Sequence, residues 1–151
     1  MKVRYLVLVA MLAAGPVAAQ GDKAAVLAVI GKVFDGMRTR DTALMRSLFV
    51  PQGARLLGVV PKDGKPALDV NDPGAWIGAV GRGTGPAWDE RIFEPTVEVD
   101  DAIAHVWACY EFWRGPTLSH CGYDSFFLVK LGEGWRVAQV ADSRRIDCKR
   151  R

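Results

Sequence analysis

The chain has 151 residues, 50% of them hydrophobic and 25% charged, with 20 basic against 17 acidic side chains. This length fits a single domain, and the small net charge of +3 argues against a nucleic-acid partner, which would require a clustered basic surface. The cysteines and histidines show no Cys-x-x-Cys or His-x-x-x-His spacing, so we expect no metal site and no cofactor. The sequence lacks the nucleophile elbow of a serine hydrolase and the placed Cys/His pair of a cysteine protease, so we expect neither class of enzyme.

Residues 1–19 have the pattern of a secretory signal peptide. Lys2 and Arg4 precede a short apolar run, and small residues at 17–19 have the cleavage spacing. The run is shorter than the roughly 20 apolar residues that span a bilayer. We therefore expect cleavage after Ala19, leaving residues 20–151 as one periplasmic or secreted domain without a membrane anchor. An uncleaved N-terminal anchor is the alternative.

The first half of the mature chain predicts three helices and a hairpin. A long amphipathic helix is expected from Asp22 to Arg40, because apolar residues recur at the helical period: Val26, Val29, Ile30, Val33, Phe34 and Met37. Asp41 can cap a second, shorter helix. Residues 54–60 and 66–70 predict two strands joined by a turn, and Pro73 begins a third helix that extends to Val80.

A glycine-rich loop follows at residues 81–86. It lacks the preceding strand and the closing Gly-Lys-Ser/Thr of a phosphate-binding loop, so we do not assign it that role. Trp76 and Trp88 flank the loop. They either close over a ligand or pack beneath the loop.

The second half predicts four consecutive antiparallel strands, at residues 90–99, 103–113, 120–131 and 135–145. Pairing Val99 with Ala102 across the first turn places Phe93, Pro95 and Val97 on the face of Tyr110 and Phe112. In the last hairpin, a three-residue loop that pairs Leu131 with Trp135 sets Asp124 opposite Asp142 and Phe126 opposite Val140.

This order of elements resembles the nuclear transport factor 2-like superfamily, the α+β cone shared by ketosteroid isomerase and polyketide cyclases. The most local resemblance lies in three short runs: His120-Cys121-Gly122-Tyr123-Asp124, Gly134-Trp135-Arg136-Val137 and Ala141-Asp142-Ser143-Arg144-Arg145. The resemblance implies an α+β fold in which a curved antiparallel sheet wraps around a long N-terminal helix with two shorter helices. It also implies a pocket at the open end of the cone and a homodimer formed through the outer sheet face.

Four polar residues are expected to converge at the mouth of this cone, namely His120, Asp124, Asp142 and Arg144. An aromatic wall would complete the pocket, with Tyr110, Phe112, Phe126 and Trp76 as the candidate ligand-binding residues. A largely apolar pocket with a few polar groups is typical of a small-molecule site, so we expect a small apolar or aromatic ligand. His105 is expected on the opposite face of the sheet.

The carboxylates of Asp124 and Asp142 across Arg144 suggest acid–base chemistry. One of them could act as a general base in an isomerase, cyclase or hydrolase, as the resemblance to ketosteroid isomerase and limonene epoxide hydrolase implies. The alternatives are a binding domain without turnover, an ion-pair network that only holds strand ends together, and a dimerising accessory domain with a vestigial cavity.

Three cysteines leave one unpaired in a compartment that permits disulfides. Cys121 and Cys148 are the expected pair if the C-terminal tail curls back, with Cys109 as a buried free thiol. A Cys109–Cys121 disulfide is the alternative.

Overall fold

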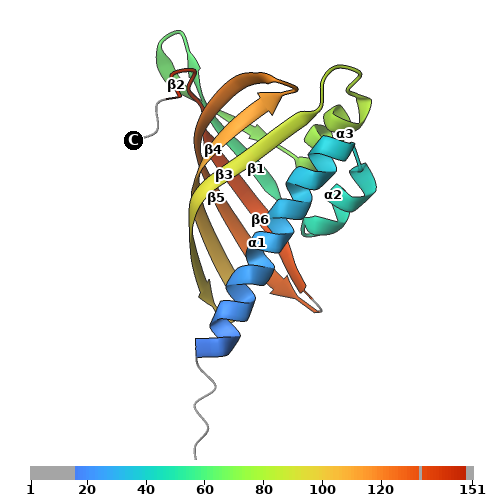
Figure 1. The fold of residues 1–151 in the computed structure, drawn as a ribbon, viewed down its shortest axis with the longest axis vertical. Coiled ribbons are helices and arrows are strands. Elements are labelled where there is room, and N and C mark those ends of the chain that lie inside the picture. The colour runs from blue at the N-terminus through green and yellow to red at the C-terminus, as the bar shows by residue number, and fades with distance from the viewer. Residues whose placement is uncertain (1–15, 133, 149–151) are drawn as a thin grey trace, which may run out of the picture.

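The computed structural model describes residues 16–132 and 134–148. It contains a long helix, two short helices and six strands (Figure 1). Their bounds are α1 Pro16–Thr39, α2 Thr42–Leu48, β1 Arg55–Lys62, β2 Lys65–Asn71, α3 Pro73–Arg82, β3 Trp88–Asp100, β4 Ile103–Arg114, β5 Thr117–Leu131 and β6 Gly134–Ser143.

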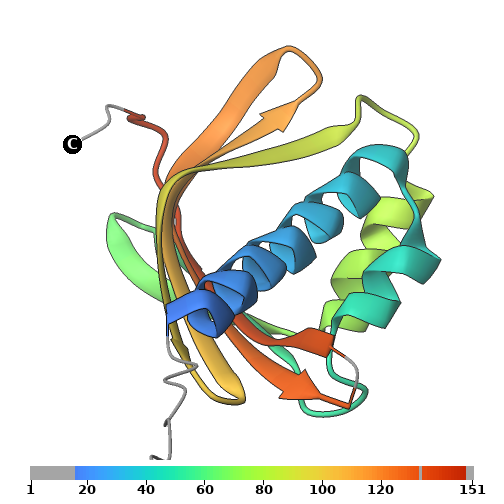
Figure 2. The same ribbon diagram turned by 60° about the horizontal axis from the view of Figure 1, so that its bottom comes forward.

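The strands form a single curved sheet in the order β2-β1-β6-β5-β4-β3. All neighbouring strands are antiparallel except β1 and β6, which are parallel, so the expected antiparallel sheet is mixed at this one pair. Figure 2 shows the sheet curling past α1, with α2 and α3 packed near the C-terminal end of that helix. The α+β fold with a long N-terminal helix and two shorter ones is confirmed.

Helix α1 forms the centre of the core because its apolar stripe faces the concave side of the sheet. Five of the six residues predicted for this stripe are buried, namely Val26, Ile30, Val33, Phe34 and Met37, and Val29 is half-buried. Its two ends are also held by polar contacts. Near the start, Asp22 accepts hydrogen bonds from Lys130 (2.8 Å) and Trp135 (3.2 Å). Near the end, Arg38 donates to Asp89 at 2.7 Å.

Most of the predicted signal peptide, residues 1–15, lies outside the described residues, and Pro16 to Ala19 belong to α1. Among the described residues, no helix is long and apolar enough to cross a membrane. Cleavage after Ala19 therefore stays a prediction.

The predicted register of β3 is wrong in two places. At the turn, Val99 pairs with Ala104 rather than Ala102, and farther along the strand a β-bulge shifts the register between Phe93 and Thr96. Glu94 adopts a φ of 48°, in the left-handed region that a bulge uses. Past the bulge the alternation is inverted, so Phe93 pairs with Cys109 on the outer face instead of joining the core.

The predicted turn between β5 and β6 is also wrong, although the pairing next to it is right. Leu131 pairs with Gly134 rather than Trp135, and a bulge between Phe127 and Leu128 then shifts the register by one residue. The shift cancels the turn error. Asp124 therefore lies opposite Asp142 as predicted.

The C-terminal tail curls back along β5 and is closed by a disulfide between Cys121 and Cys148, with Cα atoms 5.7 Å apart. Two backbone hydrogen bonds of 3.0 Å between Cys121 and Arg145 hold the same segment. Cys109 is a free thiol, half-buried rather than fully buried, and the alternative Cys109–Cys121 disulfide is excluded.

We predict that Cys148→Ser lowers the free energy of unfolding by about 3 to 4 kcal/mol, because the disulfide restricts the unfolded chain. Urea unfolding measures the change, and Cys109→Ser, which breaks no disulfide, should change it by less than about 1 kcal/mol. Non-reducing peptide mapping that found all three thiols free would contradict the pairing.

Candidate functional site

A cavity of about 400 Å³ opens between the concave face of the sheet, the last turns of α1 and helix α3. Its wall is largely apolar and aromatic, and all eight predicted site residues contribute to it. These are Trp76, Tyr110, Phe112, His120, Asp124, Phe126, Asp142 and Arg144. The structure thus brings these eight side chains together in the wall of one cavity.

Asp124 is a fully buried acidic group in the cavity wall, with 1% of its surface exposed. It points inward from β5 at a position where the alternation otherwise supplies apolar residues such as Phe126 and Leu128. Its Oδ2 atom accepts no hydrogen bond. Burial, followed by the negative charges of Glu90 and Asp142, raises the pKa of Asp124 well above its usual range and so favours the protonated carboxyl group.

Glu90 is the partner of Asp124, and the sequence analysis missed it. A side-chain hydrogen bond joins the two carboxyl groups, which requires one of them to carry a proton. Burial and the nearby Asp142 raise the pKa of Glu90 to about 7. The two shifts therefore favour a protonated Asp124 beside a Glu90 carboxyl group whose pKa is about 7.

The bulge explains why Glu90 was missed. An uninterrupted β3 would place Glu90 on the outer face with Glu94, whereas the inverted alternation directs it toward Phe112 and the cavity. The available signal was Pro95, since proline within a strand marks an edge or a bulge.

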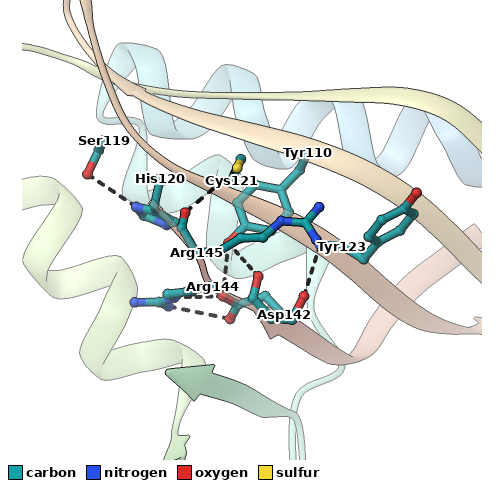
Figure 3. Close-up of polar contacts among 9 residues, drawn as sticks. Tyr110, Ser119, His120, Cys121, Tyr123, Asp142, Arg144 and Arg145 are labelled. Carbon is teal, nitrogen blue, oxygen red and sulfur yellow. Dashed lines mark hydrogen bonds and ion pairs between the residues drawn. The ribbon is translucent and has the colours of Figure 1, made fainter. Parts of the chain in front are cut away.

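Asp142 and Arg144 form a second polar unit, visible in Figure 3. Arg144 donates from Nε to Asp142 Oδ2 at 2.6 Å, and the Tyr110 hydroxyl donates to the same oxygen at 3.2 Å. Burial, together with the charge of Asp142, raises the pKa of Tyr110, so the phenol keeps its proton and remains a donor. The hydrogen bonds of Arg144, which directly follows β6, go to Asp142 two residues before it.

A glycine makes this arrangement possible. A Cβ atom on Gly122 would lie 1.6 Å from the Ser143 carbonyl oxygen and 2.9 Å from Tyr110 Cε1. Only glycine therefore lets the end of β6 and the tyrosine ring approach β5 this closely. Tyr110 uses the approach to donate to the Ser143 carbonyl oxygen at 3.2 Å, as well as to Asp142.

His120 lies at the aromatic side of the cavity. Its ring stacks on Phe112 with centroids 4.7 Å apart, and its Nδ1 lies 3.2 Å from Ser119 Oγ (Figure 3). Burial and the charge of Arg144 lower the pKa of His120, which favours the neutral imidazole. His105 lies on the outer face as expected, 2.9 Å from Ser125 Oγ.

Both tryptophans that flank the glycine-rich loop line the cavity while packing on aromatic neighbours. Trp76 meets Phe49 edge-to-face with centroids 6.2 Å apart, and Trp88 meets Phe112 in the same way at 5.8 Å. Among the described residues, no group of three or more His, Cys, Asp or Glu side chains is placed to hold a metal ion. The site can therefore offer an apolar wall, a proton donor, a carboxylate and a positioned ion pair.

Comparison with solved structures shows the fold. A nuclear transport factor 2-like protein of unknown function from Shewanella baltica is similar, with 19% identity and a TM-score of 0.62 over 83% of this chain and 95% of its own. A protein of unknown function from Mycobacterium tuberculosis has 16% identity and a TM-score of 0.70 over 88% of this chain and 78% of its own. A nuclear transport factor 2-like protein with a cystatin-like fold from Novosphingobium aromaticivorans has 16% identity and a TM-score of 0.65 over 86% and 85%.

No curated protein matches this chain. The model of one family, Lumazine_bd_2, described as "Putative lumazine-binding", matches residues 21–141. This match covers most of the chain and agrees with the fold of the solved relatives. The chain therefore belongs to the Lumazine_bd_2 family, within the nuclear transport factor 2-like superfamily.

Proposed function

We propose that this chain binds a small, largely apolar or aromatic molecule in the cone cavity. The observation that carries the proposal is the buried Asp124 carboxyl group, which lines a cavity of about 400 Å³ and, among the described residues, forms no ion pair with an arginine or lysine. Burying such a group is costly, and a ligand that hydrogen-bonds to it would offset the cost. The cavity volume lies within the usual range of about 300 to 1,000 Å³ for ligand pockets.

The family description supports a heteroaromatic ligand. Lumazine is a planar bicyclic molecule with ring N–H and carbonyl groups, and Asp124 with Glu90 offers one donor beside one acceptor. The aromatic wall at Phe112 and Phe126 suits a flat ring system. Lumazine is therefore the first compound to test, within a wider class of planar molecules that carry adjacent donors and acceptors.

Acid–base catalysis is the second candidate function, and the Glu90–Asp124 pair favours it. A general base is most effective when its pKa lies near the working pH, and burial brings that of Glu90 to about 7. Asp124 would supply the proton and Glu90 would accept one, with Asp142 held in place by Arg144 and Tyr110. Glu90 thus replaces Asp142 as the better candidate base. The alternative of a vestigial cavity would predict a collapsed core with both aspartates in solvent. It is not supported, because the cavity has a volume of about 400 Å³ and Asp124 is buried.

We also propose export and a homodimer. The disulfide between Cys121 and Cys148 fits an oxidising compartment, periplasmic or extracellular, and the signal-like pattern of residues 1–19 agrees with it. The outer sheet face exposes an apolar patch of Ile103, Trp107 and Phe127, at 47%, 48% and 37% of their surfaces. A second copy could cover this patch.

The ligand proposal predicts opposite effects of Asp124→Asn on stability and on binding. The substitution should leave the melting temperature unchanged or raise it, because it replaces a strained buried acid with an amide of the same shape. Affinity for lumazine, or for a ligand that native mass spectrometry finds on protein from its own host, should fall at least about tenfold, the loss of one hydrogen bond to a buried group. Asp63→Asn, at the β1–β2 turn, is the matched control. A loss of about 3 to 5 kcal/mol in stability would instead assign Asp124 to a structural network.

The raised pKa of Glu90 predicts a pH-dependent stability. Between its ordinary value of 4.5 and about 7, the unfolded chain loses this proton while the folded chain keeps it, so the free energy of unfolding should fall as pH rises through this window. The change should be about 3 kcal/mol, since the window spans about 2.5 pKa units and one unit corresponds to about 1.4 kcal/mol. Urea unfolding from pH 4.5 to 8 should show a flatter profile for Glu90→Gln than for Glu98→Gln, an exposed position on the same strand. Equal profiles would refute the raised pKa.

The dimer proposal predicts that Trp107→Glu gives a monomer, because a buried charge would oppose association at the patch. Sedimentation equilibrium of both proteins measures this. A monomeric parent protein at concentrations of about 100 μM, well above the Kd of a stable dimer, would exclude the interface.

A further inference from the structure

A second, smaller cavity of about 150 Å³ adjoins the first beneath the glycine-rich loop. The two cavities share three lining residues, Met37, Trp88 and Arg114, which therefore lie between them. The rest of the second cavity is formed by Arg40, Val80, Gly83, Gly85 and Pro86. It is thus an apolar pocket with two arginines in its wall.

Arg114 holds a defined position in this wall. Its guanidinium lies over the Trp88 ring, 5.9 Å from the centroid, and the two residues are paired across β3 and β4. Because the arginine stacks on the indole that stands between the cavities, its charge faces both. Its electrostatic effect reaches His120 in the main cavity, where it helps to lower the pKa of the imidazole.

Arg40 reaches the second cavity from the end of α1. Its guanidinium donates a hydrogen bond to the Gly85 carbonyl oxygen, which fixes the side chain against the loop. The turn between β4 and β5 packs on the same loop, since Gly115 N donates to Ala87 O at 2.9 Å. Arg40 is therefore held against the glycine-rich loop, and Arg114 lies at the end of β4, next to a turn that is hydrogen-bonded to the residue after that loop.

Neither guanidinium forms an ion pair with a carboxylate in the described part of the chain. Asp89, which follows Trp88 in the sequence, forms ion pairs with Arg38 and Arg91 instead, each at 2.7 Å. In the main cavity Arg144 is likewise neutralised by Asp142. Among the described residues, the charges of Arg114 and Arg40 at the second cavity are thus unpaired, whereas the charge of Arg144 in the first cavity is paired with Asp142.

We propose that the second cavity receives an anionic group, a carboxylate, sulfonate or phosphate, of the ligand whose apolar body occupies the first. This inference rests on the proposed function and deepens it by naming the ligand class as amphipathic anions. Arg114 makes the principal contact and Arg40 a lesser one. Trp88 contacts the ligand where its apolar body meets its charged end.

Two fluorescent probes with the same aromatic body test this. 8-Anilinonaphthalene-1-sulfonate carries an anionic group, and N-phenyl-1-naphthylamine does not. The parent protein should bind the sulfonate at least tenfold more tightly than the neutral probe. Arg114→Gln should weaken the sulfonate about tenfold, the loss of one charge-assisted contact, and leave the neutral probe within about twofold. Arg40→Gln should weaken the sulfonate less.

Two control variants localise the effect. Arg136→Gln removes an arginine that lines neither cavity and should change neither affinity. Ala79→Phe fills the main cavity from α3 and should weaken both probes, which shows that they bind inside rather than on the outer sheet face.

Equal affinities for the two probes, or an equal effect of Arg114→Gln on both, would overturn the anion site and leave the proposed function standing. Absence of cavity binding by either probe, with Ala79→Phe indistinguishable from the parent protein, would overturn the proposed function and the anion site together.

Discussion

The packing of α1 into the concave face of the sheet determines where a site can exist. Its stripe from Val26 to Met37 is buried along its whole length, and contacts at Asp22 and Arg38 hold the two ends to the sheet. The curved sheet is larger than one helix can cover, so space remains beside the last turns of α1. Helix α3 covers this space without filling it. The cavity is therefore a consequence of how a single straight helix fits a strongly curved sheet.

Local patterns predicted the elements of this fold well because helices and strands depend on short-range periodicity. The stripe of α1, the Asp41 cap of α2 and the proline at the start of α3 were each recognised from a few neighbouring residues. The four strands of the meander were found by the same means. The pairing of β1 with β6 was not, because a parallel pair between distant strands leaves no local signal.

Strand register was predicted less well, since one extra residue inverts every side chain that follows it. In β3 the bulge at Glu94 places Phe93 on the outer face and Glu90 in the cavity wall. The sequence analysis assumed a regular strand and therefore did not include Glu90 in the site. In β5 and β6 the bulge at Phe127 cancelled the error in the turn, so Asp124 and Asp142 were placed correctly for an incomplete reason. The candidate site was thus predicted partly from the true alternation of side chains along the strands and partly because two errors in strand register cancelled.

Asp142 and Arg144 bind each other at the end of β6, so in the described part of the chain Asp124 forms no ion pair. Arg144 follows the last residue of β6, and its guanidinium turns back onto the Asp142 carboxylate two residues before it. Asp124, opposite Asp142 on β5, instead has the Glu90 carboxyl group as a neighbour. The cavity wall therefore carries three kinds of polar group: a buried acid at Asp124, a neutralised ion pair at Asp142 and Arg144, and a guanidinium at Arg114 that no described carboxylate pairs with. A ligand with a hydrogen-bonding head and an anionic end has one favourable orientation in such a cavity, and a symmetric apolar molecule has none.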